Sequence, residues 1–109
     1  MENDVGGVFA ALADPTRLRV IELLGEQARR AGELSAAAGT SAPVMSRHLR
    51  VLLEAGLVTD ERVPHDARLR VFRLRSEPVQ ALQAWLDQLQ AHWSEQLGSF
   101  KRYVEEGER

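Results

Sequence analysis

A glycine between two short helix-like segments most constrains the fold of this chain. Gly39 follows residues 32–38, and Ser41 opens a second segment that ends at Gly56. Glycine adopts the left-handed conformation that ends a helix at little steric cost, and serine caps the start of the next helix. Two helices joined by a short glycine-containing turn predict a helix-turn-helix over residues 31–56.

Two strand-like segments follow the second helix. Residues 57–63 and 69–74 are β-branched and charged rather than helical in period, and residues 64–67 between them have the composition of a turn. A hairpin in this place predicts a wing over residues 57–75. The expected fold is mainly α with a small β-hairpin (α+β): a winged helix-turn-helix of about five helices and a two-stranded wing in one domain, residues 1–109.

Helices are also predicted upstream of the turn. Asp14-Pro15 opens one of them, because aspartate caps free N–H groups and proline needs no hydrogen bond at the first helical position. A shorter helix before it is indicated by apolar residues at helical spacing, namely Val5, Val8, Phe9 and Leu12.

A long amphipathic helix is expected after the wing. It begins at Ser76-Glu77-Pro78, where the serine is a natural cap. Its apolar stripe is longer than a domain this small needs to cover its own core: Leu82, Trp85, Leu86, Leu89, Trp93, Leu97, Phe100 and Val104. Since small domains bury a modest fraction of their surface, such a stripe is a candidate oligomer interface.

The charge is distributed unevenly around a net value of −2. Residues 42–75 hold seven Arg against four acidic residues. Residues 1–41 hold four Arg against six acidic residues, and residues 76–109 hold three basic against six acidic residues. A basic middle between acidic flanks predicts that a polyanion binds on one face of the protein.

Several function classes lack their sequence signals. The chain contains no cysteine, which excludes disulfides and thiolate metal sites. No apolar run approaches membrane-spanning length and no signal-peptide pattern is present, so a cytoplasmic protein is expected. His48, His65 and His92 fall on three different predicted elements, and no catalytic constellation or phosphate-cradling glycine loop is found. We therefore predict neither an enzyme nor a cofactor.

The helix after Ser41 carries candidate DNA-contacting side chains opposite its apolar face. Arg47 suits a bidentate contact with guanine, Ser46 a phosphate or base edge, and Val44 a thymine methyl group. His48 either donates to a phosphate or packs beside the buried face. The negative charge of Asp66 reduces the positive charge at the tip of the wing, so the wing is expected to contribute modestly to DNA binding. The predicted DNA-binding residues are Ser41, Ala42, Pro43, Val44, Ser46, Arg47, His48, Arg50, Arg62, Arg68 and Arg70.

Four stretches of the chain carry a family resemblance: residues 9–19, 32–34, 46–52 and 54–58. Their most specific runs are ALADPTRL and SRHLRVLLEAGLV. They resemble the ArsR/SmtB winged-helix repressors of bacteria and archaea. The resemblance implies a homodimeric transcriptional repressor that binds double-stranded DNA at a palindromic, inverted-repeat operator, with autoregulation as one option.

The same resemblance implies a dimer interface built from the first and last helices, residues 1–13 and 77–106. The side chains assigned to it are Val5, Val8, Phe9, Leu12, Leu82, Trp85, Leu86, Leu89, Trp93, Leu97 and Phe100.

Metal sensing is common in that family, but this chain departs from its ligand patterns. One pattern needs cysteines near Ser35 and Ala37, and neither of these is a ligand for a soft metal. Another needs Asp and His near Val79 and Ala81, and only its His-x-x-Glu half is present. The chain therefore resembles a branch without recognisable metal ligands, and its effector is left unspecified. The remaining candidates are Asp87, His92 and Glu95.

Two alternative functions stay open at this stage. One is a metal-responsive repressor with an atypical site on the C-terminal helix. The other is a winged-helix module that binds proteins, because helix-turn-helix geometry also occurs in proteins that do not contact DNA. The coincidence of a helix pair, a wing and local positive charge in one segment favours DNA binding.

Overall fold

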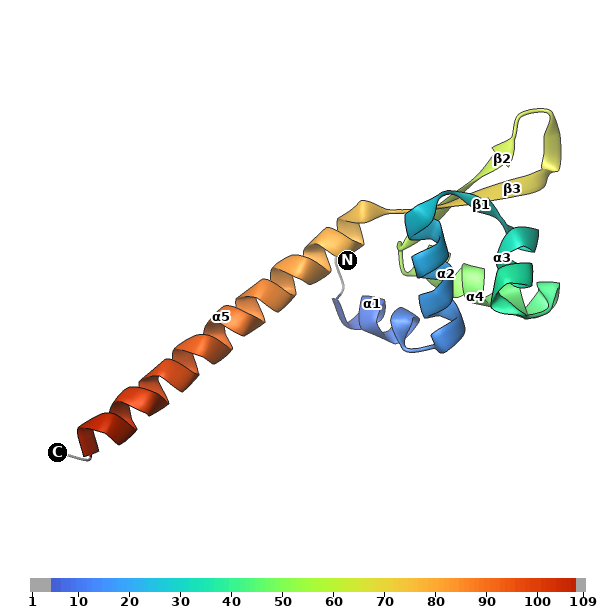
Figure 1. The fold of residues 1–109 in the computed structure, drawn as a ribbon. Coiled ribbons are helices and arrows are strands. Elements are labelled where there is room, and N and C mark those ends of the chain that lie inside the picture. Colours follow the sequence, from blue (N-terminus) through green and yellow to red (C-terminus); the bar gives the residue numbers. More distant parts are fainter. Residues whose placement is uncertain (1–4, 108–109) are drawn as a thin grey trace.

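The computed structural model describes residues 5–107. A compact head carries one long helix that projects from it, and the principal extents are 76 × 26 × 23 Å (Figure 1). The elements in chain order are α1 (Val5–Leu12), α2 (Pro15–Glu26), β1 (Arg29–Arg30), α3 (Ala31–Ala38), α4 (Ala42–Glu54), β2 (Val58–Val63), β3 (Asp66–Leu74) and α5 (Ser76–Gly107). The predicted winged helix-turn-helix of class α+β is confirmed.

The predicted capping residues start α2 and α4. The carboxylate of Asp14 accepts the backbone N–H groups of Thr16 at 2.8 Å and Arg17 at 3.1 Å. The hydroxyl of Ser41 accepts the N–H of Val44 at 3.4 Å. Each cap satisfies N–H groups that lack an acceptor in the first helical turn, and this sets where both helices begin.

The turn between α3 and α4 has the left-handed glycine that the sequence predicts. Gly39 has φ 66°, and its N–H donates to the carbonyl of Ala36. The N–H of Thr40 reaches the carbonyl of Ser35 at 3.1 Å. These bonds close the last turn of α3 and redirect the chain within two residues, so that α4 packs against α3.

The sheet has one strand more than the sequence predicts. Its order is β1-β3-β2, and all pairs are antiparallel. Arg29 and Arg30 form the additional strand β1, in which Arg30 pairs with Val71 and Arg29 with Phe72. The half-buried Arg29 side chain also donates to the carbonyl of Leu23 and to Glu26. Strand β1 forms because its backbone pairs with that of β3, which is distant in the sequence. The local sequence of β1 carries no signal for this pairing.

The wing, which we define as β2, β3 and the turn between them, is tighter than expected. The turn was predicted over residues 64–67 and the second strand from residue 69, whereas β3 already begins at Asp66. The register shifts between Arg62 and Val63, and Val63 pairs with Asp66 while Arg62 pairs with Arg70. The irregularity lets the strand start earlier by leaving extra residues in β3 unpaired.

The core lies inside the head, between the helices and one face of the sheet. Its buried side chains come from every element except β1, α5 and the wing turn: Val8, Ala11, Val20, Leu23, Leu24, Leu34, Met45, Leu49, Leu52, Leu57, Val58 and Phe72. In α4 the buried side chains are Met45, Leu49 and Leu52. Because they share one face of the helix, the opposite face points toward solvent.

Candidate nucleic-acid interface

Helix α4 has one buried face and one solvent face, as its sequence predicts. Met45, Leu49 and Leu52 are at most 3% exposed. The predicted contact residues lie on the other side or at its edges: Ser41, Ala42, Pro43, Ser46, Arg47 and Arg50 are exposed, and Val44 and His48 are half-buried. The solvent face therefore presents two hydroxyls, two guanidinium groups and small side chains in the space of about two turns.

Arg47 and Arg50 are not neutralised by neighbours. No ion pair joins either guanidinium to a carboxylate in the part of the chain that the structure describes. An unpaired arginine on a helix surface keeps its five donors for a ligand, and its planar fork matches a guanine edge or a phosphate.

His48 lies at the edge of this face, and its ring is close to Arg17 and Asp14. Its Nδ1 is 3.2 Å from Nη1 of Arg17 and 4.0 Å from a carboxylate oxygen of Asp14. Because a guanidinium can only donate, the contact with Arg17 is a hydrogen bond where Nδ1 carries no proton and accepts. The ring of His48 is thus packed against α2 on one side and half-buried at the edge of the solvent face.

Asp14 is the acidic member of this cluster. The backbone N–H of Arg17 bonded to its carboxylate lowers the pKa of Asp14 below its ordinary value. Burial acts in the opposite direction, whereas the N–H of Thr16 and the nearby charges of His48 and Arg17 lower the pKa further. The carboxylate is therefore ionised where it caps α2.

The wing arginines differ from those of α4 in being paired. Asp66 accepts the backbone N–H and the Nε of Arg68, the latter at 3.2 Å. Arg70 lies 2.6 Å from a carboxylate oxygen of Asp60, and its guanidinium carbon is 5.1 Å from the centre of the Phe72 ring. Arg62, on β2, is exposed and stands opposite Arg70. These pairs reduce the positive charge at the wing.

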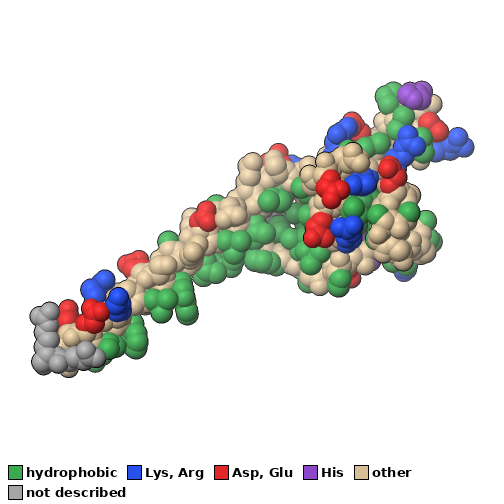
Figure 2. All heavy atoms as spheres, viewed as in Figure 1, with side chains coloured by type: hydrophobic (Ala, Val, Ile, Leu, Met, Phe, Trp, Pro, Cys, Tyr) green, Lys and Arg blue, Asp and Glu red, His purple; other side chains and the backbone are tan. Residues whose placement is uncertain are grey.

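Apolar side chains line α5 on the side that meets α1, which gives a green band along the projecting helix (Figure 2). The rings of Phe9 and Trp85 meet edge to face with centroids 5.6 Å apart. Most of the stripe is exposed in the single chain: Trp85, Leu86, Leu89, Trp93, Leu97, Phe100, Tyr103 and Val104. Val8 lies in the core at 3% exposure, and Val5, Leu12 and Leu82 are half-buried.

Comparison with known proteins agrees with this geometry. The sequence profile of a helix-turn-helix domain matches residues 12–61. The HTH-type transcriptional regulator Rv2034 of Mycobacterium tuberculosis is 35% identical to this chain, and the match covers 89% of this chain and 85% of Rv2034. The transcriptional repressor SdpR of Bacillus subtilis is 34% identical over 53% of this chain, and the match spans 64% of SdpR.

Solved structures show the same similarity. The ArsR family transcriptional regulator RHA00566 superposes with a TM-score of 0.73 at 30% identity, covering 82% of this chain and 89% of its own. An ArsR-like transcriptional regulator from Rhodococcus sp. RHA1 superposes with a TM-score of 0.78 at 28% identity, covering 90% of both chains. The chain belongs to the ArsR/SmtB family. It is a winged helix-turn-helix, DNA-binding transcriptional regulator and not an enzyme.

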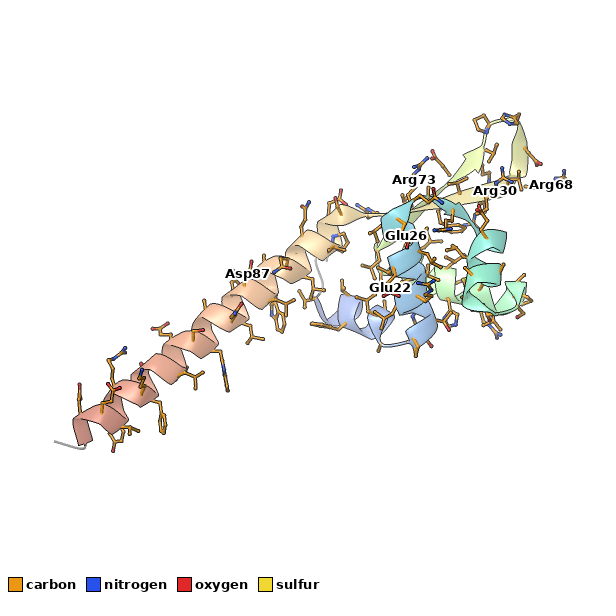
Figure 3. The ribbon with its side chains drawn as sticks, viewed as in Figure 1. Glu22, Glu26, Arg30, Arg68, Arg73 and Asp87 are labelled. Carbon is orange, nitrogen blue, oxygen red and sulfur yellow. The ribbon has the colours of Figure 1, made fainter. Side chains whose placement is uncertain are left out.

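The C-terminal helix of this ArsR/SmtB protein carries the residual metal-ligand candidates on its surface. Asp87, which is labelled in Figure 3, is exposed on α5, as are His92 and Glu95. The carboxylate of Asp87 accepts a hydrogen bond from Gln83 at 2.9 Å. Within residues 5–107, no three His, Cys, Asp or Glu side chains are grouped so that they can hold a metal ion. Over the same stretch, no helix has the length and apolar character needed to cross a membrane.

Sequence reasoning missed one basic residue of the candidate interface. Arg30 ends β1 and precedes α3, and it lines a cavity together with Arg50, Arg68 and Arg70. The only local signal was the pair Arg29-Arg30 ahead of a short helix, which is equally typical of a solvated loop. The pairing of Arg30 with Val71 is what brings it beside the wing.

Proposed function

We propose that this protein is a homodimeric transcriptional repressor that places α4 in the major groove of an inverted-repeat operator. The observation that carries the proposal is the pair of unneutralised guanidinium groups, Arg47 and Arg50, on the solvent face of a helix whose other face is buried. A helix with this division fits the major groove and presents donors to base edges and phosphates.

The remaining predicted contacts follow from the same placement. Ser41, Ala42, Pro43, Val44, Ser46 and His48 lie along the start and outward side of α4. The wing residues Arg62, Arg68 and Arg70 follow the DNA backbone beside it. Because Arg68 and Arg70 are paired with Asp66 and Asp60, we expect them to add affinity with little base preference.

The homodimer is proposed to form through α1 and α5. In the single chain, aromatic and aliphatic side chains of α5 stay exposed over most of the helix, for example Trp93 at 63% and Phe100 at 67%. Burial of such surface is favourable by about 25 cal/mol per Å², and a second copy offers a matching apolar stripe. Two-fold symmetry of the protein then requires two-fold symmetry of the operator.

Regulation of its own operon is included in the proposal, and it makes the test direct. Fragments bound by the purified protein are selected from genomic DNA, and its own promoter region is assayed separately for band shift. The expected result is enrichment of a short inverted repeat with half-sites one helical turn apart, or a multiple of it. An Arg47→Ala variant should lose the enrichment, and an Arg19→Ala variant, altered on the exposed surface of α2, should keep it. Unselective binding by the unaltered protein contradicts the proposal.

A further inference from the structure

A cavity of about 330 Å³ opens between the start of α3, the solvent side of α4 and strand β3. Among the residues that the structure describes, four arginines and no aspartate or glutamate line it: Arg30, Arg50, Arg68 and Arg70. Figure 3 shows Arg30 and Arg68, which come from β1 and β3, at the same end of the head above α3. Residues far apart in the sequence therefore converge on one concave, basic site.

The charge of this cavity is only partly neutralised. Arg70 is paired with Asp60 at 2.6 Å, and Arg68 with Asp66 at 3.2 Å. In residues 5–107, neither Arg30 nor Arg50 makes an ion pair with a carboxylate. The lining of the cavity thus keeps an excess of positive charge, and the nearby carboxylate of Glu33 accepts the backbone N–H of Arg30 at 3.0 Å.

The shape and the lining suit an oxyanion. Guanidinium groups donate two parallel hydrogen bonds to a phosphate, and Ser46 adds a hydroxyl donor. The floor contains Phe72, which is 1% exposed, and an apolar floor screens charge less than water does. An anion held by several arginines over such a floor is bound more strongly than one on an open surface.

The cavity also lies between α4 and strand β3 of the wing, the two parts of the head that the proposed function places against DNA. We propose that it is an oxyanion site that seats one backbone phosphate of the bound DNA, with Arg30 and Arg50 as its unneutralised cations. This inference rests on the proposed function, and it adds Arg30 to the protein groups that contact DNA. The shared chemistry also admits a free inorganic phosphate, which serves as a probe of the site without DNA.

The first arm of the test uses the full chain without DNA. Inorganic phosphate is titrated while the amide signal of Gly32, a residue that lines the cavity, is followed by nuclear magnetic resonance. Sodium chloride at matched ionic strength is the reference. We expect a saturable shift with phosphate, weakened at least several-fold in Arg30→Gln and retained in Arg102→Gln, whose side chain bonds Ser99 on distant α5. A shift that is linear and equal to that of chloride overturns the site.

The second arm measures DNA affinity of the same variants against salt concentration. Loss of one phosphate contact makes the negative slope of log affinity against log salt less steep by about 0.9 and weakens binding evenly across sequences. We expect this change in Arg30→Gln, partial recovery in Arg30→Lys, and no change in Arg102→Gln. An unchanged slope in Arg30→Gln overturns the assignment to DNA. If the unaltered protein fails to bind DNA selectively, the proposed function fails, and the phosphate titration still decides the site.

Discussion

The side chain of Arg17 joins α2 to α4 by lying 3.2 Å from Nδ1 of His48. The same guanidinium donates through Nε to the carbonyl of Ala11 at the end of α1. One side chain therefore connects three helices, and it satisfies a carbonyl that α1 leaves without an internal partner. Through His48 it also contacts α4 at the edge of its solvent face.

Replacement of Arg17 by alanine should destabilise the head. Two or more hydrogen bonds are lost at about 0.5–1.5 kcal/mol each, so the free energy of unfolding should fall by roughly 1–3 kcal/mol. Urea denaturation measures this difference. The control is Arg19→Ala on the same helix, whose exposed side chain makes a long 3.9 Å pair with Glu22 and should change stability by less than about 0.5 kcal/mol. Equal losses in the two variants would refute the bracing role.

Asp14 should make stability depend on pH in the acidic range. Its pKa in the folded protein is lowered from the ordinary value of 3.8. A depressed folded pKa contributes stability that is present above the unfolded pKa and is lost as the pH falls through the folded pKa. Asp14→Asn keeps a capping side chain and removes the charge. We expect this variant to melt below the unaltered protein at pH 7, with the gap closing below about pH 3.8. A gap that stays constant down to acid pH argues against the linkage.

Glycine substitutions should separate the turn of the helix-turn-helix from ordinary helix positions. Gly39 has φ 66°, and a Cβ built there meets no atom within 4 Å. Gly39→Ala should therefore destabilise by about 1–2 kcal/mol through backbone conformation alone. Gly25 lies in α2 with equally open space, so Gly25→Ala should stabilise by roughly 0.4–1 kcal/mol. Thermal melts of both variants check these opposite signs, and a shift of the same sign would contradict the explanation.

Arg47 and Arg68 should differ in what their loss does to DNA binding. Arg47→Ala removes from α4 a guanidinium group that makes no ion pair. It should reduce the discrimination between the best DNA site and its base-pair variants by about 1–3 kcal/mol. Arg68 is already paired with Asp66, so Arg68→Ala should weaken all sites slightly and evenly. Competition binding with single-base variants of the selected site separates the two effects. Uniform weakening by both variants speaks against base contact by Arg47.

The apolar side of α5 should control the oligomeric state. Leu89 is 48% exposed on the stripe, and Ala91 lies two residues on, at the opposite side of the helix. Leu89→Glu places a charge in the proposed interface and should yield a monomer in sedimentation experiments, while Ala91→Glu should not. Circular dichroism confirms that both variants keep their helices. A Leu89→Glu protein with unchanged mass in solution would exclude this face from the dimer.

Most of the head could be predicted because its signals are short in range. The caps at Asp14 and Ser41, the left-handed Gly39 and the apolar spacing along α4 each act within one or two helical turns. The outward direction of Arg47 follows from that spacing once Met45 and Leu49 are buried. Local rules of this kind are visible in a single sequence.

Other features depend on segments that meet only after folding. Sequence determined the helix-turn-helix itself, its caps and the two faces of α4, since hydrogen bonds and periodicity near each residue decide them. Tertiary structure alone decided that β1 pairs with β3, that Val8 lies in the core rather than on the surface, and that Arg17 reaches His48. The same long-range pairing carries Arg30 to the arginine-lined cavity, because the position of a side chain in a cavity depends on every strand and helix that forms its walls.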